Sequence, residues 1–228
     1  MKLEGIDIAI EKTERRKTVS IFIERDGSVR VLAPTTATDE TIENAVKAKE
    51  YQIYTKLAKW KELNQGKVKR EFVNGQSFLY FGRNYRLALV ENQAVPLRLS
   101  GGHLQFDKKQ LNKAHKVFKD FYKEKAEQKI TERLELIQEK FELKPTSIKV
   151  SELQNRWASW TPKNGLNFHW KCAMAPIPVL DYIITHEMVH LKYPNHSAEF
   201  WNELDKKMPN FREYEQWLRI NGVKMDLF

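Results

Sequence analysis

The sequence predicts an α+β protein that consists of an N-terminal β-rich lobe with a helix, a long linking helix and a compact C-terminal region. Three observations lead to this class. Short segments of alternating polarity fill the first 107 residues, apolar residues then recur at three- and four-residue steps, and a second apolar stripe follows near residue 186. We therefore expect residues 1–107, 108–144 and 145–228 to form the lobe, the helix and the C-terminal region.

The N-terminal lobe should open with a β-hairpin. Apolar side chains alternate over residues 19–23 and again over 29–31, and Asp26-Gly27 between them is a favoured two-residue hairpin turn. Thr38 then caps a predicted helix that runs to Trp60 and ends at Asn64–Gly66. Glycine-punctuated strands are expected after it at residues 78–81, 85–90 and 97–99.

The linking helix is predicted over residues 108–142, where the apolar positions trace one helical face. Two strands should follow, at Ile148–Leu153 and Leu166–Trp170, with a turn at residues 162–165 between them. By analogy with folds in which a strand edge holds an extended peptide, the second strand is a candidate substrate shelf.

The most informative motif is Thr185-His186-Glu187-Met188-Val189-His190, with His196 five residues later. In a helix, His186 and His190 lie one turn apart on the same face, with Glu187 beside them. Imidazole nitrogens bind zinc, and three protein ligands leave one position open for water. Glu187 is then placed to act as a general base toward that water.

The flanking residues favour a helix around this motif. Pro176 and Pro178 fit a helix start, and Pro194 fits its end. A buried stripe is expected between them, at Ile177, Leu180, Ile184, Met188 and Leu191.

The third metal ligand is less tightly specified by the sequence. His196 lies just after Pro194, in a turn before a helix that Ser197 can cap, and we favour it as the ligand. Glu199 and Glu203 on that next helix are the alternatives, because some proteases complete a two-histidine site with a glutamate.

Several other residues are candidates for substrate binding. The guanidinium of Arg156 could fix a carboxylate or phosphate, or stabilise an oxyanion, although it could equally stack on a neighbouring tryptophan. Asn167, Tyr193 and Tyr214 are further candidates for orienting a substrate. His169 is expected to be structural, and His103 and His115 belong to no recognisable pattern.

Composition limits the classes of protein to consider. The 228 residues carry a formal charge of +9, with no apolar run near 18 residues and a single cysteine, Cys172. The sequence also opens without a signal-peptide core. We expect a soluble cytoplasmic protein without disulfides or a membrane association, whose basic surface could attract nucleic acid weakly.

The chain also resembles the YgjP-like family of metal-dependent hydrolases, relatives of the SprT and WLM zincins. The resemblance is carried by motifs along nearly the whole sequence, including Phe81-Gly82-Arg83-Asn84-Tyr85, Arg156-Trp157-Ala158-Ser159-Trp160, Leu180-Asp181-Tyr182, His186-Glu187, Asn195-His196-Ser197 and Phe200-Trp201. It implies a zincin-like C-terminal core, zinc ligands at positions 186, 190 and 196, and a base at 187. Ala158 and Trp160 stand where that family usually has Gly and Cys.

Three functions remain open at this point. A zinc metallopeptidase acting on a protein or peptide substrate is favoured, with manganese, nickel or cobalt as other possible metals. A nucleoside triphosphate pyrophosphohydrolase could use the same site, with Arg156 neutralising phosphates. A nucleic-acid-associated binding module or a DNA-linked protease is the third.

Overall fold

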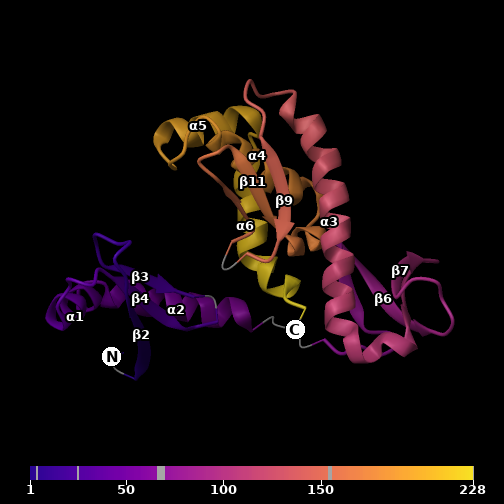
Figure 1. Cartoon of the computed structure of the whole chain (residues 1–228), viewed down its shortest axis with the longest axis horizontal. Coiled ribbons are helices and arrows are strands. Elements are labelled where there is room, and N and C mark those ends of the chain that lie inside the picture. Colours follow the sequence, from indigo (N-terminus) through magenta and orange to yellow (C-terminus); the bar gives the residue numbers. More distant parts are fainter. Residues whose placement is uncertain (4, 25, 66–69, 154–155, 228) are drawn as a thin grey trace. The chain divides into compact units, whose positions relative to one another are not determined.

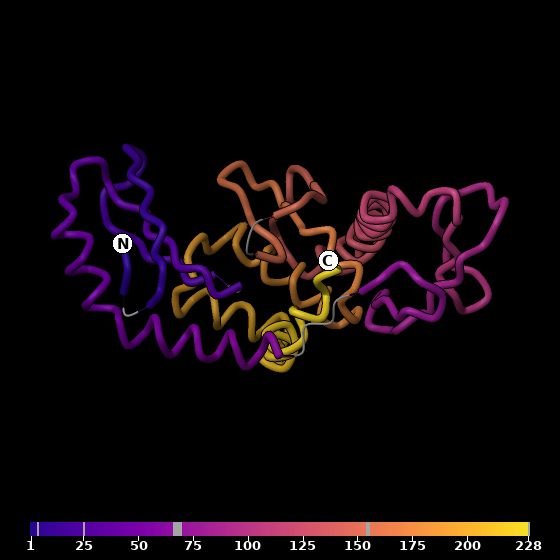
Figure 2. The backbone as a smooth tube through the Cα atoms, turned by 90° about the horizontal axis from the view of Figure 1, so that it is seen from below, coloured from indigo at the N-terminus to yellow at the C-terminus, as the bar shows by residue number. Residues whose placement is uncertain are grey.

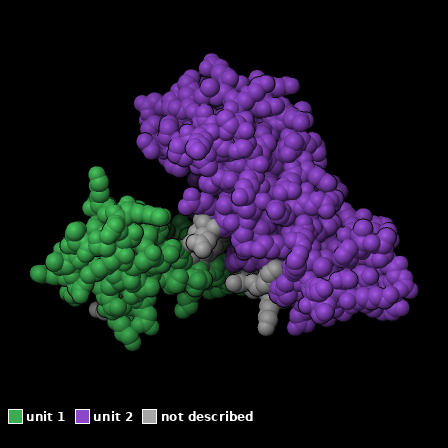
Figure 3. Space-filling model, in the orientation of Figure 1, with its two compact units in different colours: residues 1–67 green, residues 68–228 purple. Residues whose placement is uncertain are grey.

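The structure, a computed structural model, describes residues 1–3, 5–24, 26–65, 70–153 and 156–227. Small mixed sheets and helices alternate along the chain, which confirms the α+β class (Figure 1). The chain divides into two compact units, residues 1–67 and residues 68–228 (Figure 3). None of the helices in the described ranges is long and apolar enough to cross a membrane.

The first unit contains a four-stranded sheet in the order β1-β2-β4-β3. The strands are β1 (Lys2–Leu3), β2 (Ile6–Lys12), β3 (Ser20–Ile23) and β4 (Val29–Ala33). β3 and β4 form the expected antiparallel hairpin, with Gly27 at φ 92° in its turn. β2, which the sequence analysis missed, pairs with β4 in parallel.

Two helices pack on this sheet where the sequence predicted one. Thr38 caps α1 (Asp39–Lys47), accepting a hydrogen bond of 3.2 Å from the Thr41 N–H. The chain leaves helical dihedral angles at Lys49, and α2 (Glu50–Asn64) follows and runs along one side of the strands (Figure 2). Neither Gly nor Pro marks this break, so the sequence carried no signal for it. The core of the unit is built from Leu3, Ile8, Val29, Val31, Ala33, Ile42, Val46 and Ile53.

The second unit begins with another four-stranded sheet, ordered β5-β6-β8-β7. Its strands are β5 (Ser77–Tyr80), β6 (Arg83–Val90), β7 (Leu97–Ser100) and β8 (His103–Asp107). The first three match the predicted strands. β8 was missed, and it pairs antiparallel with β7 through a turn at Gly101-Gly102, both of which have positive φ.

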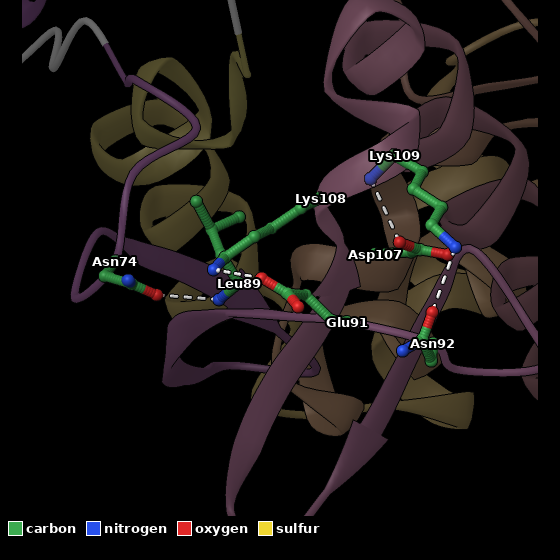
Figure 4. Close-up of polar contacts among 7 residues, drawn as sticks. All are labelled: Asn74, Leu89, Glu91, Asn92, Asp107, Lys108 and Lys109. Carbon is green, nitrogen blue, oxygen red and sulfur yellow. Dashed lines mark hydrogen bonds and ion pairs between the residues drawn. The ribbon is translucent and has the colours of Figure 1, made fainter.

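Polar contacts hold one end of this sheet to the helix that follows (Figure 4). The Asp107 carboxylate accepts a hydrogen bond from the Lys109 N–H and so caps a 3₁₀ helix, η1 (Lys108–Lys113). Lys108 pairs with Glu91 at 2.9 Å, and the Lys109 ammonium donates to Asn92. The predicted linking helix therefore begins with a 3₁₀ segment, and its α-helical part, α3, spans Ala114–Gln138.

The unit boundary differs from the boundary at residue 107 that the sequence suggested. The reason lies in the core, because Phe78 of β5 and Phe106 of β8 pack on Phe118 of α3 with ring centroids 4.6 Å and 5.7 Å apart. This sheet therefore shares one hydrophobic cluster with α3 and with the C-terminal helices. The strands of residues 77–107 belong with the second unit.

The third sheet is three-stranded and has the order β10-β11-β9. It contains β9 (Ser147–Ser151), β10 (Ala158–Trp160) and β11 (Gly165–His169), with β11 antiparallel to β10 and parallel to β9. The expectation that Leu166–Trp170 is a substrate shelf was therefore wrong, because β11 is paired on both sides and offers no free edge. The short edge strand β10 was missed.

The remaining elements surround the motif helix, α4 (Ile177–His190). α4 packs against α3, α6 and β10 (Figure 1). Arg133 of α3 donates two 2.7 Å hydrogen bonds to the Asp181 carboxylate of α4. The other elements after β11 are η2 (Trp170–Met174), α5 (Ala198–Lys207), α6 (Phe211–Asn221) and η3 (Gly222–Met225).

The turn between β5 and β6 fixes the chain just before α4. The N–H groups of Phe81 and Gly82 donate to the carbonyl oxygens of Ala173 and Met174 at 2.8 Å and 3.0 Å. Gly82 has φ +79°, and a Cβ there would lie 2.8 Å from the Pro176 Cα. Only glycine permits both this conformation and this close approach.

Arg70 joins the two ends of the second unit. Its guanidinium donates to the carbonyl oxygens of Lys224 and Asp226 at 2.7 Å and 2.6 Å, and also to the Ser77 carbonyl of β5. The last turn of the chain is thereby bound to the first strand of the unit.

Candidate metal centre

Three histidines converge in the second unit. His186 and His190 lie one turn apart on α4, and His196 lies in the turn between α4 and α5. Their candidate ligand nitrogens all lie within 4.8 Å of one another, and the Nε2 atoms of His186 and His196 are 2.9 Å apart. Within the described ranges this is the group of His, Cys, Asp and Glu side chains that is arranged to hold a metal ion.

The donor set fits a zinc ion. Nitrogens that share a tetrahedral zinc at about 2.0–2.1 Å lie roughly 3.3 Å from one another, which is close to the spacing here. Burial lowers the pKa of His186 to about 3, with smaller contributions from the neighbouring rings of His190 and His196. Burial also lowers the pKa of His190. Both rings are therefore neutral at pH 7, and neutral imidazole is the form that binds a metal.

Hydrogen bonds orient only part of this group. The Nδ1–H of His190 donates to the Tyr193 carbonyl at 3.0 Å, which leaves Nε2 free as a ligand atom. Nδ1 of His186 is buried and has no hydrogen-bond partner. The Tyr193 carbonyl thus fixes the orientation of the His190 ring.

Glu187 is buried beside the histidines, with 7% of its surface exposed. The backbone N–H of Trp160 donates to its carboxylate, while Oε2 is buried without a partner. Burial raises the pKa of Glu187 to about 7, and the Trp160 hydrogen bond and the charge of Arg156 partly oppose this shift. The carboxyl group can therefore both accept and release a proton near neutral pH.

The edge strand β10 presents its backbone to this site. Trp157 C=O and Thr161 N–H bond to β11, so by antiparallel alternation the polar groups of Ala158 and Trp160 point away from β11. The Trp160 ring lies 6.4 Å from the His190 ring, and its Nε1–H donates to Asn164 at 3.3 Å. Within the described residues β10 pairs only with β11.

The other predicted substrate-binding residues fall in different places. Arg156 is exposed, and its charge acts on Glu187. Tyr193 reaches the cluster through its carbonyl, as described above. Asn167 is half-buried and lies on the sheet face opposite to buried Leu166 and Phe168. Tyr214 is partly buried against the core.

The alternative ligands and the remaining histidines lie outside the group of three. Glu203 pairs with Lys207 at 3.3 Å, and exposed Glu199 accepts a hydrogen bond from Ser197, which lowers its pKa. His169 is buried and caps η2, with its Nδ1 accepting from the Lys171 N–H at 3.0 Å. Cys172 is also buried, and burial raises its pKa to about 12.

Three aromatic residues at the site were not assigned a role by the sequence analysis. Trp160 supplies the backbone N–H to Glu187, and Phe200 and Trp201 of α5 lie against the histidine rings. The sequence placed Phe200 and Trp201 on a helix, but only the tertiary fold shows that they meet the histidines.

Two histidines of one helix flank a glutamate at this site, which is an arrangement typical of metallopeptidases. The family of the YgjP-like metallopeptidase domain matches residues 17–221, which is most of the chain. The chain belongs to this family, and membership supports a metal-dependent peptidase that acts on proteins or peptides. The nucleotide pyrophosphatase alternative receives no support from the comparisons.

Among solved structures, the chain is similar to the metallopeptidase zymogen of Pyrococcus abyssi abylysin. The sequences are 22% identical, and the match covers 41% of this chain and 92% of the other, with a TM-score of 0.37. No curated protein sequence matches this chain.

Proposed function

We propose that this protein is a zinc-dependent peptidase that cleaves an extended peptide, with Glu187 as the general base. The supporting observation is the convergence of three histidines, two of which are kept neutral by burial, beside a buried glutamate. His186, His190 and His196 would hold the ion, which supplies a Lewis acid that activates water and polarises the scissile carbonyl when bound. Cobalt, manganese or nickel could occupy the same nitrogens.

Glu187 moves the proton in this proposal. One of its carboxylate oxygens is held by the Trp160 N–H, which leaves Oε2 as the oxygen without a partner. Oε2 takes a proton from the attacking water and returns it to the leaving amine. Because the carboxylate is held by a backbone group of β10, its position is coupled to the strand that would carry the peptide.

The edge of β10 is the proposed peptide site. The outward polar groups of Ala158, and the outward carbonyl of Trp160, are free to pair with an extended chain in the manner of an added strand. This assignment replaces the expected shelf on β11. Arg156, which precedes β10 and acts electrostatically on Glu187, would bind a substrate carboxylate or the developing oxyanion.

A parallel assay tests the reaction. Zinc-loaded protein is incubated with unfolded casein and, separately, with nucleoside triphosphates, and peptide release and pyrophosphate are followed. Glu187→Gln should lower peptide release by about 10²–10⁴-fold and retain bound zinc, because it removes proton transfer and no ligand. Arg156→Gln should lower activity less.

The triphosphate arm distinguishes the alternatives. Pyrophosphate release that needs Glu187, with casein left intact, would replace the peptidase proposal by the nucleotide one. Salt-sensitive DNA binding that persists in the Glu187→Gln variant would instead favour the nucleic-acid-associated module.

A further inference from the structure

The described residues provide unusually few hydrogen bonds to orient the three candidate ligands. Histidines that bind metals almost always donate their second ring nitrogen to a carboxylate, carbonyl or water, and this bond fixes the ring. Here His190 forms that contact, whereas Nδ1 of His186 is buried without a partner, and the rings of His186 and His196 meet through their Nε2 atoms, which are the atoms that would bind the ion. His196 also lies in an exposed turn. Another kind of contact is needed to hold these two rings when their Nε2 atoms bind a metal.

Phe200 contacts all three imidazoles. Its ring centroid lies 4.9 Å, 4.5 Å and 4.7 Å from those of His186, His190 and His196, respectively. The ring is completely buried. It meets two of the imidazoles edge to face, with interplanar angles of 67° and 68°, a geometry favoured by aromatic pairs.

Trp201 completes the contact on the side of the exposed turn. Its ring stacks on His196 at 5.5 Å with an interplanar angle of 28°, and it also lies 6.2 Å from His186. On the other side it stacks on Phe211 of α6 at 5.7 Å. The imidazole of the turn is thereby connected through Trp201 to a buried residue of another helix.

We propose that the aromatic pair, Phe200 and Trp201, consists of positioning residues that hold the three histidine rings in a metal-binding arrangement by packing. Buried aromatic rings have few rotamers and fit closely, so they can fix a neighbouring ring without a hydrogen bond. They also leave the ligand nitrogens without competing donors. A site held within about 0.5 Å of its productive geometry requires such support.

The proposal rests on the metal site put forward above, and it is tested with Co²⁺ as the probe. Affinity is measured by competition with a chelator, and the absorption spectrum of bound Co²⁺ reports the coordination geometry. We expect Phe200→Leu to weaken Co²⁺ binding by roughly 10–100-fold and to change the spectrum, as removal of an outer hydrogen-bond partner does.

A matched control separates positioning from general packing. Phe118 of α3 is equally buried, but its contacts with the rings of Phe72, Phe78, Phe106 and Tyr122 involve none of the three candidate ligands. Phe118→Leu should lower the denaturation midpoint of the metal-free protein about as much as Phe200→Leu and leave Co²⁺ affinity unchanged. Equal losses of affinity in both variants would overturn the proposal.

Trp201 gives a second test at a partly exposed position. Trp201→Phe keeps an aromatic ring and should retain Co²⁺ affinity, whereas Trp201→Leu should weaken it. Wild-type affinity in both Phe200→Leu and Trp201→Leu would overturn the positioning role and leave the peptidase proposal standing. If the wild-type protein itself bound no Co²⁺ or Zn²⁺, the proposed function would fail first.

Discussion

The two regions that provide the proposed metal ligands differ in how their backbone is held. α4 is buried along most of its length, and His186 and His190 are fixed by helix geometry and by packing on α3, α6 and β10. His196 comes from an exposed turn, and its ring depends on contacts with its neighbours. The comparison indicates that a stable scaffold can supply two ligands while a short segment adds the third.

The strongest test of this comparison removes the ligand of the turn. His196→Ala should weaken zinc binding by more than the roughly 100-fold that loss of an outer partner can cause, because a direct donor is lost. His186→Ala should have at least as large an effect. Zinc content after dialysis is measured. Glu199→Ala and Glu203→Ala are the controls and should keep stoichiometric zinc; if Glu203→Ala lost it while His196→Ala did not, the third ligand would be reassigned.

A second test disturbs the support of the helix without touching a ligand. Gly82→Ala places a Cβ 2.8 Å from the Pro176 backbone at φ +79°. Strain and overpacking together should lower the free energy of unfolding by about 2–4 kcal/mol. Chemical denaturation of the wild type and the variant measures this difference in the free energy of unfolding. Gly102 also has a positive φ, but an added Cβ would meet open space. Gly102→Ala should therefore lower the free energy of unfolding less, because only the backbone strain remains.

A third test loosens α4 at its contact with α3. Asp181→Asn removes the carboxylate that accepts two hydrogen bonds from partly buried Arg133, and it should destabilise the protein by about 1–3 kcal/mol. The exposed pair Lys116–Asp120 offers a contrast, since Asp120→Asn should cost less than about 0.5 kcal/mol. Equal unfolding free energies for the two variants would contradict the assigned role of Asp181.

At neutral pH the smallest expected effect concerns His169, a buried histidine that accepts a backbone hydrogen bond and lies outside the metal site. Its pKa is lowered to about 4, chiefly by burial and then by the charge of Lys171. The unfolded chain, with a pKa near 6.5, therefore binds the proton first, and stability falls as the pH drops from about 6.5 to 4.

His169→Asn isolates this contribution, because an amide oxygen can replace Nδ1 as the acceptor for the Lys171 N–H. Unfolding free energies are compared at several pH values between 7 and 4. The variant should lose less stability than the wild type over this range, and parallel curves would show that His169 is not the group responsible.

The sequence predicted the elements with strong local signals. The Asp26-Gly27 turn predicted the hairpin, and the proline-bounded apolar stripe predicted α4, because both depend on contacts between near neighbours. It missed β10, which has only three residues, and β8, which follows two glycines. It also missed the break at Lys49 between α1 and α2.

Only the part of the candidate site that depends on local spacing could be predicted from the sequence. The spacing of His186 and His190 fixes their common helix face, so their proximity follows from the sequence. The Trp160 N–H at Glu187 joins segments 27 residues apart in the sequence. The contact of the Phe200 ring with three imidazoles depends on how α5 packs against α4, which the sequence alone does not specify. The sequence also could not specify which way the side chain of Asn167 points, because the register of β11 depends on tertiary packing.

The bonds of Arg70 have a consequence for the order of folding during synthesis. Arg70 bonds to main-chain oxygens about 150 residues later, at Lys224 and Asp226. Such long-range closure is slow and comes late, since the nascent chain grows from its N-terminus. The second unit therefore cannot complete these contacts until residue 226 has left the ribosome, whereas residues 1–67 have their own core and can fold while translation continues.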